Sequence, residues 1–354
     1  MTGEMWTLTH AYESKDEVDK VLAYLADIAK SSQTVDQRLG GAESYKNTFS
    51  KFLDSKDEAV RAFSAIALAC TGDKSFAPRL AKIVNERDES FTERFAPGAS
   101  FVRGRSAVAL GLMQATEYKS DIARLLKSKN EYDRSGAISA LIELNAIEFT
   151  GEIVSLLANK DLAFDDDDSP IYFLIETKQV GKYKKEIVQA MLGQSHMKVS
   201  ESATYALAAI GAKEHARDVA RLLKNEFRQG CAAKALALMG ASEYSGEIAK
   251  LLSAKSGLTR NAAMVSLAIL DSKKHIQAIV RIYNNDPKIY VKPQAAVALL
   301  LLGKPQYYRE IKLETALKEP PKLSELDFHY FVLEKLKPYN EKLLANLNSQ
   351  QTNR

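Results

Sequence analysis

The sequence predicts an all-α fold, a right-handed α-solenoid of about eight helix-turn-helix repeats with helical caps. The first of three observations is a leucine that recurs at intervals of 42, 31, 33, 33, 29, 31 and 32 residues. A period near 31 is typical of arrays of two-helix units. The eight leucines are Leu68, Leu110, Leu141, Leu174, Leu207, Leu236, Leu267 and Leu299.

The second observation is a ring that follows each leucine after eight residues, or after nine in the fourth copy, where it is Tyr183. An aliphatic residue comes four positions after the ring, which predicts that the ring begins a second amphipathic helix. The other rings are Phe76, Tyr118, Phe149, His215, Tyr244, His275 and Tyr307, and the aliphatic residues are Leu80, Ile122, Ile153, Ile187, Val219, Ile248, Ile279 and Ile311. Because His215 and His275 replace an aromatic ring, we interpret both as packing residues.

The third observation is a pair of alanines before most of the leucines. In the sixth copy, Ala232, Ala235 and Leu236 share one helical face, and Gly240 is expected to end that helix. Small residues at this position let neighbouring helices approach closely. The pairs are Ala107/Ala109, Ala137/Ala140, Ala203/Ala206, Ala262/Ala263 and Ala295/Ala298.

These residues resemble a known family. The runs Val60–Leu68 and Val102–Gly111 are similar to the V-R-x-x-A-x-x-A-L-G line of HEAT repeats, in the short HEAT-like variety first associated with phycobilisome lyases. An arginine stands seven residues before the leucine in four copies, and Lys292 takes its place in the eighth; copies four to six depart with Asp167, Ser200 and Gln229. The four arginines are Arg61, Arg103, Arg134 and Arg260. The resemblance divides the chain into a cap (1–53), a repeat array (54–319), and a C-terminal cap with a frayed tail (320–354).

The resemblance implies that the leucine-bearing helix lines a concave groove. The positions five and two before each leucine are then expected to face it: Phe63/Ile66, Arg105/Val108, Gly136/Ser139, Ser169/Tyr172, Ser202/Tyr205, Cys231/Lys234, Ala262/Val265 and Gln294/Val297. Tyrosine is enriched at interfaces. The sequence therefore nominates Tyr172 and Tyr205 as partner-binding residues, flanked by Arg105 and Lys234, although burial within a tight superhelix would explain the same pattern.

Two segments interrupt the repeat. The interval after Leu68 is about eleven residues longer than the period and contains Phe91 and Phe95, which are alternative partner contacts, since insertions in repeat arrays often lie on the binding face. Asp165–Asp168 precede the fourth leucine-bearing helix, where Asp168 or Ser169 is expected to cap it and the carboxylates favour its dipole; a basic partner and a metal are the alternatives.

Both ends of the chain are predicted to form helical caps. Ser14 and Glu17 form a capping box for a helix over residues 14–31. Another helix is expected from Ser324, and Pro338 is expected to stop it.

Composition suits a soluble protein: 46% of the 354 residues are apolar and 27% are charged, and no apolar run is long enough to span a membrane. Cys70 and Cys231 are expected to be reduced, which favours the cytoplasm, although a secreted protein without its signal peptide would look the same. Residues 226–318 carry 14 Lys/Arg against 7 Asp/Glu, so this basic C-terminal part could meet nucleic acid.

No phosphate loop, acid–base pair or ligand spacing is evident, so no catalytic residue, metal site or cofactor is predicted. We therefore interpret the protein as a non-catalytic scaffold or adaptor that binds a protein or peptide in its groove. The alternatives are an enzyme subunit of the bilin-lyase type and a nucleic-acid-binding repeat protein.

Overall fold

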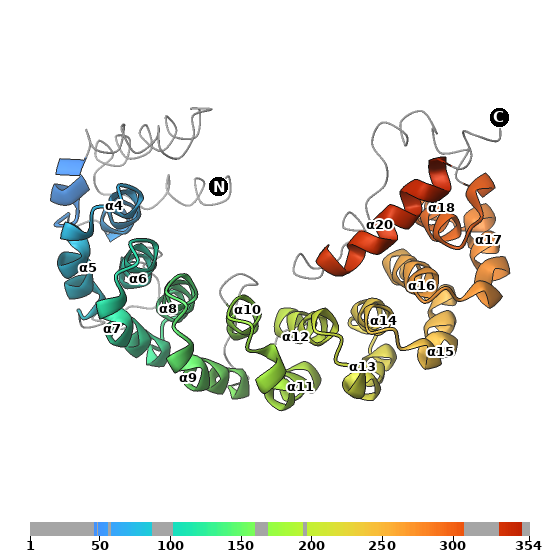
Figure 1. Ribbon diagram of the computed structural model, residues 1–354, viewed down its shortest axis with the longest axis horizontal. Helices are drawn as coiled ribbons and strands as arrows, with labels where there is room; N and C mark the ends of the chain where they lie inside the picture. Colours follow the sequence, from blue (N-terminus) through green and yellow to red (C-terminus); the bar gives the residue numbers. More distant parts are fainter. Residues whose placement is uncertain are drawn as a thin grey trace. The chain divides into compact units, whose positions relative to one another are not determined.

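A computed structural model describes residues 46–47, 49–55, 58–86, 102–159, 169–193, 197–307 and 333–348 (Figure 1). Within these ranges the regular secondary structure is helical, with no strand, and no helix is long and apolar enough to cross a membrane. The chain divides into two compact units, unit 1 (Met1–Thr177) and unit 2 (Lys178–Arg354). This division falls inside the fourth repeat, where the sequence did not predict one. The predicted boundaries of the two caps stay predictions.

Unit 1 contains two layers of helices. The inner layer carries the repeat leucines, and each of its helices packs against the next, α4 on α6, α6 on α8 and α8 on α10. The inner helices are α4 (Glu58–Cys70), α6 (Val102–Leu112), α8 (Glu131–Glu143) and α10 (Pro170–Glu176). The outer helices are α5 (Ala77–Val84), α7 (Lys119–Arg124) and α9 (Thr150–Ser155).

Unit 2 repeats this arrangement, with α12 packed on α14, α14 on α16 and α16 on α18. Its inner helices are α12 (Met197–Ala209), α14 (Gln229–Leu238), α16 (Gly257–Ile269) and α18 (Val291–Leu301). Its outer helices are α11 (Lys184–Leu192), α13 (Ala216–Arg221), α15 (Ser245–Lys250) and α17 (Ile276–Asn285). The prediction of an all-α array of helix-turn-helix repeats is therefore confirmed.

All eight inner helices end in the same way. The residue four positions after each repeat leucine has a left-handed backbone, with φ between 44° and 76°. Beyond it the chain turns back, as when the Ala241 N–H donates to the Leu236 carbonyl over 3.0 Å, a common helix C-cap. The eight residues are Gly72, Gln114, Asn145, Lys178, Gly211, Gly240, Asp271 and Gly303. The predicted end at Gly240 is thus one instance of a repeated cap.

The ring after each cap lies where the sequence places it. In seven copies it is the last residue of a one-turn 3₁₀ helix that leads into the outer segment, for example Ser242–Tyr244 before α15. His215 and His275 occupy the same position before α13 and α17. The aliphatic residue four positions later is fully buried in every copy from Leu80 to Ile279. Ring and aliphatic residue therefore anchor the outer layer on the inner layer.

The small residues lie at the seam between neighbouring inner helices, and all ten paired alanines are buried. The approach is closest between α6 and α8, where a Cβ on Gly136 would lie 2.3 Å from the Gly104 carbonyl oxygen. At this seam the absence of a side chain is a steric requirement.

The C-terminal helix α20 (Leu333–Asn348) packs on α18. The predicted stop at Pro338 is wrong, because α20 continues through it. Proline has no backbone N–H to donate to the preceding turn of the helix. Because Pro338 is exposed, water can donate to the carbonyl that is left without this partner. The predicted helix over 14–31, the helix start at Ser324 and the frayed tail at 349–354 lie outside the described residues.

Candidate functional site

The inner face of unit 1 is the side of its inner layer that turns away from the outer helices. Its accessible side chains recur five before, two before and two after the repeat leucine. In α4 these are Phe63, Ile66 and Cys70, and in α6 they are Arg105, Val108 and Leu112, of which Leu112 is 44% exposed. In α8 and α10 the positions two before and two after the leucine are accessible: Ser139, Glu143, Tyr172 and Glu176. The positions five and two before the leucine belong to the predicted groove line, and the position two after was not predicted.

Not every predicted position is accessible. Gly136 is buried against α6, and Ser169 is buried because its hydroxyl accepts from the Tyr172 N–H and so caps α10. Arg105 and Tyr172, the two nominated residues of unit 1, are both partly exposed.

In unit 2 the position two before the leucine is closed, whereas Cys231 and Gln294, five before their leucines, are partly exposed. The residue two before the leucine is buried in all four inner helices: Tyr205 is 1% exposed, Lys234 8%, Val265 2% and Val297 5%. The expectation that Tyr205 and Lys234 face an open groove is thus corrected. A role for them in partner binding stays a prediction that would need this face to open.

The helix α20 accounts for closure at α18. Figure 1 shows it on the side of α18 away from α17. Leu336 and Leu343 of α20 are fully buried, and the Asn346 amide donates to the Leu300 carbonyl over 2.8 Å. At α18 the chain therefore covers its own inner face, an arrangement invisible in the repeat pattern because the covering helix lies outside it.

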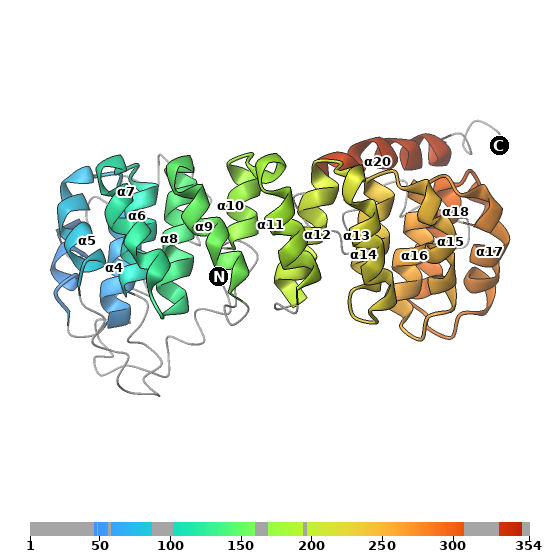
Figure 2. The same ribbon diagram turned by 90° about the horizontal axis from the view of Figure 1, so that it is seen from below.

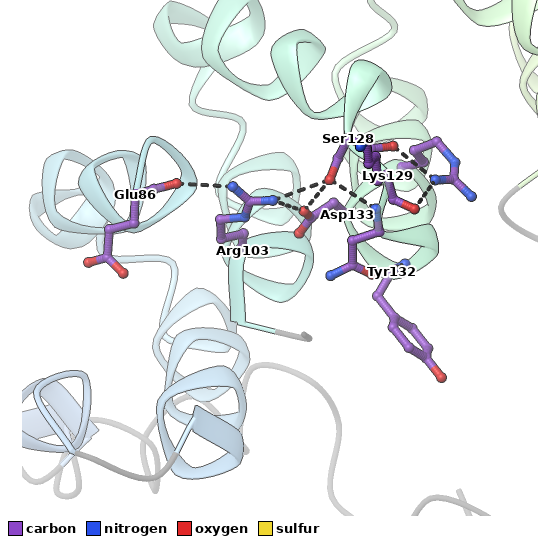
Figure 3. Close-up of polar contacts among 8 residues, drawn as sticks. Glu86, Arg103, Ser128, Lys129, Tyr132 and Asp133 are labelled. Atoms are coloured by element: carbon purple, nitrogen blue, oxygen red, sulfur yellow. Dashed lines mark hydrogen bonds and ion pairs between the residues drawn. The ribbon is translucent and has the colours of Figure 1, made fainter. Parts of the chain in front are cut away.

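The repeat arginines bind the loops that join one repeat to the next. Figure 3 shows Arg103 donating to the Glu86 carbonyl over 3.0 Å, to the Ser128 hydroxyl over 3.2 Å, and to Asp133. The Asp133 side chain is fully buried, and the Ser128 hydroxyl donates to it over 2.8 Å. Tyr132 points away from this network. The arginine that recurs seven residues before the repeat leucine thus hydrogen-bonds neighbouring repeats to each other, a role that we call an internal tie.

Arg260 makes the corresponding tie in unit 2. Its Nε and Nη2 donate to the two Asp286 carboxylate oxygens over 2.6 and 2.7 Å, and Nη1 donates to the carbonyls of Ala254 and Lys255 over 2.7 and 3.0 Å. Arg134 holds the carbonyls of Ser128 and Lys129 in the same way. The Arg260 hydrogen bonds hold the pKa of Asp286 below its usual range.

The inter-repeat loops and the first turns of the inner helices expose large apolar side chains that the sequence analysis did not identify. Tyr132 is 43% exposed, Phe227 82%, Leu258 64% and Ile289 90%. A signal was available, because the segments Lys129–Tyr132 and Lys224–Phe227 both have the form Lys-Asn-Glu-aromatic. Each asparagine side chain accepts from the aromatic residue's N–H, over 2.9 and 3.0 Å.

Phe91, Phe95 and the aspartates at 165–168 lie outside the described residues. Both cysteines are free thiols. Burial, with a smaller contribution from Glu201, raises the pKa of the Cys231 thiol, so this group stays protonated at neutral pH. Burial, together with Lys274, lowers the pKa of His275, which favours the neutral imidazole expected of a packing residue.

Neither a family model nor a curated protein matches the sequence. Similar solved structures have low sequence identity. The CpcE–CpcF complex of phycocyanin lyase from Nostoc sp. PCC7120 is 17% identical, over 85% of this chain and 94% of that one, with a TM-score of 0.31. Kap121p bound to Nup53p is 12% identical over all of this chain and 44% of that one, with a TM-score of 0.48. Human deoxyhypusine hydroxylase in complex with glycerol is 16% identical, over 85% and 98% of the chains, with a TM-score of 0.30.

The eight caps at one register, the 3₁₀ turn after each and the arginine tie describe the repeat without reference to those structures. They show an array of helix-turn-helix repeats whose inner face, at the position two before the leucine, is accessible in unit 1 and buried in unit 2.

Proposed function

We propose that the protein is a non-catalytic scaffold or adaptor that binds a segment of another protein along the inner face of unit 1. The observation that carries the proposal is the contrast between equivalent positions. Two residues before the leucine, Ile66, Val108, Ser139 and Tyr172 are accessible, whereas the four equivalents in unit 2 are buried.

The chemistry of this face suits a protein segment. Phe63, Ile66, Val108 and Leu112 offer apolar area on two neighbouring helices, and Arg105 adds a donor between them. Interfaces typically combine an apolar centre with arginine and aromatic side chains that keep a polar end. Tyr172 supplies such an aromatic group on α10.

The test begins with a pull-down and mass spectrometry, which identify candidate partners for titration against purified variants. Leu112→Asp with Tyr172→Ala is expected to weaken binding at least about tenfold, because truncating one central interface residue often costs about 2 kcal/mol. Both side chains are accessible, so the helical signal should persist. Tyr205→Ala is a poor probe, because emptying a buried aromatic site destabilises the fold by about 3–5 kcal/mol.

The matched control is Ile147→Asp. Ile147 is 48% exposed but lies in the 3₁₀ turn before α9, not on the inner face. It should leave the affinity unchanged. Equal binding by the wild type and the inner-face variant, with both folded, would refute the proposal and leave the segment around Phe91 and Phe95 as the better candidate.

A further inference from the structure

The loops between repeats of unit 2 form a row of lysines and exposed apolar residues, which we call the edge ladder. Its three rungs are Lys224 with Phe227, Lys255 with Leu258, and Lys288 with Ile289 and Tyr290. The first two rungs have the same register, with the lysine twelve and the apolar residue nine positions before the repeat leucine. Each rung therefore occurs at the same point of its repeat, the start of an inner helix.

The ladder is on the opposite edge of unit 2 from α20. Figure 2 shows α20 along one edge of α14–α18 and the inter-repeat loops along the other. The contacts of α20 agree with this view, because Lys342 lies 3.7 Å from Asp271, which follows the C-terminal end of α16. The helix that closes part of the inner face thus leaves the ladder uncovered.

The apolar side chains of the ladder are strongly exposed although their loops are ordered by hydrogen bonds. Phe227 is 82% exposed, Leu258 64% and Ile289 90%. The Asn225 side chain holds the backbone at Phe227, and the Asp286 carboxylate accepts from the Lys288 N–H over 2.9 Å. Exposed apolar groups that form a continuous patch rimmed by polar residues typically mark an interaction surface.

The second and third rungs are connected. Arg260 spans two of them by binding the carbonyls of the Lys255 loop and the carboxylate of Asp286. The Tyr290 ring lies over Gly257, where a Cβ would come within 2.5 Å of its hydroxyl oxygen. Leu258 and Tyr290 therefore belong to one continuous surface.

The charge of the ladder is positive. Lys224, Lys255 and Lys288 are exposed, and within the described part of the chain none of them forms an ion pair. Between residues 224–228, 254–258 and 286–290, the acidic side chains are Glu226 and Asp286, and Asp286 is engaged by Arg260. A partner that covers the ladder therefore needs carboxylates beside apolar groups.

We propose that the edge ladder binds an acidic amphipathic helix of a partner protein. Packed helices lie about 8–10 Å apart, so successive rungs are separated by about that distance. A helix rises 1.5 Å per residue, so about five to seven residues span one rung. A partner helix with leucines at heptad spacing, flanked by glutamates, matches both the apolar period and the lysines. A nucleic-acid backbone fits the ladder less well. Leu258 and Ile289 can form no hydrogen bond or ion pair with phosphate groups, and the Glu226 carboxylate repels them.

The test uses the full chain and a fluorescein-labelled synthetic helix about three heptads long, with leucine at the a and d positions and glutamate at the flanking ones. Binding is followed by fluorescence polarisation. The triple variant Phe227→Ser/Leu258→Ser/Ile289→Ser is expected to weaken binding at least about tenfold, and so is Lys224→Glu/Lys255→Glu. The changed side chains are exposed, so thermal unfolding should be unaltered.

The matched control is Ile210→Ser, which removes a 44% exposed isoleucine at the opposite edge of unit 2 and should bind as the wild type does. Inner-face variants of unit 1 should also bind normally, so this proposal fails or succeeds independently of the proposed function. Three results would overturn it: no binding of the acidic helix, equal binding of a version with lysine for every glutamate, or ladder-dependent binding of phosphatidylserine vesicles in the absence of peptide binding. The last result would assign the ladder to a membrane surface.

Discussion

Replacing Arg260 by alanine is expected to destabilise unit 2 strongly and to loosen two inter-repeat loops together. The guanidinium is part of a nearly buried ion pair, in which the side chains of Arg260 and Asp286 are 10% and 4% exposed. The pair is bidentate, with distances of 2.6 and 2.7 Å. Removing one member of a buried pair leaves the other uncompensated, which typically costs about 3–5 kcal/mol.

The hydrogen bonds around the pair adjust this figure. The variant also deprives the carbonyls of Ala254 and Lys255 of their donor, a further penalty if water cannot reach them. The penalty is reduced because the Asp286 carboxylate still accepts a hydrogen bond from the Lys288 N–H. We therefore expect Arg260→Ala to lower the free energy of unfolding by about 3–5 kcal/mol. In a double-mutant cycle with Asp286→Asn the coupling should be about 0.5–3 kcal/mol.

Urea unfolding followed by circular dichroism measures the loss, and hydrogen exchange locates it. Amides of α16 and α18 should exchange faster, since a repeat array is stabilised by contacts between neighbours. The control is Lys213→Ala, which removes an ion pair with Glu243 whose side chains are about half exposed, at 3.8 Å, and should cost at most about 1 kcal/mol. A loss below about 1 kcal/mol for Arg260→Ala, or a coupling near zero, would refute the assignment of Arg260 as an internal tie.

Two further predictions concern pH and packing. The Arg260 hydrogen bonds lower the pKa of Asp286 in the folded state below the unfolded value of about 3.9. The stability that they provide is therefore present above that value and is lost as pH falls through the folded pKa. Urea midpoints measured at decreasing pH should fall less steeply in Asp286→Asn than in the wild type. Gly136→Ala should cost about 1–3 kcal/mol, because its Cβ would lie 2.3 Å from the Gly104 carbonyl oxygen. Gly151→Ala, with no atom within 4 Å of its Cβ, should leave the thermal midpoint unchanged or raise it slightly.

The repeat could be predicted from sequence because its determinants are local and recur at one register. The leucine, the ring eight residues later and the aliphatic residue after it keep one spacing in every copy but the fourth, where the ring comes one residue later. Even the cap was visible where it is glycine, as at Gly240. It was hidden at Gln114, Asn145, Lys178 and Asp271, where a residue with a side chain adopts the same left-handed backbone.

The accessibility of the inner face could not be predicted, and at α18 the reason is that it depends on α20, a segment outside the repeat. Tyr172 and Tyr205 occupy equivalent positions, yet one is partly exposed and the other is buried. Nothing in the period distinguishes them. The helix α20, which closes α18, was expected to end at Pro338, five residues before its buried Leu343.

Copies five and six lack the repeat arginine, and the hydrogen bonds around that position favour a structural explanation of the loss. Ser200, at the arginine position of copy five, donates to the Met191 carbonyl over 2.8 Å. In copy six, Arg228 stands one residue before the usual position and donates to the Gly193 carbonyl over 3.2 Å. Ser200 therefore binds a carbonyl at the end of the helix just before its own, much as Arg134 and Arg260 bind the loops that precede their helices, whereas Arg228 reaches the segment before α12, one repeat earlier. If these substitutes stabilise the array as the arginines do, Ser200→Ala should destabilise unit 2 by about 1 kcal/mol and leave partner binding unchanged, because the tie is internal and the accessible surfaces lie elsewhere.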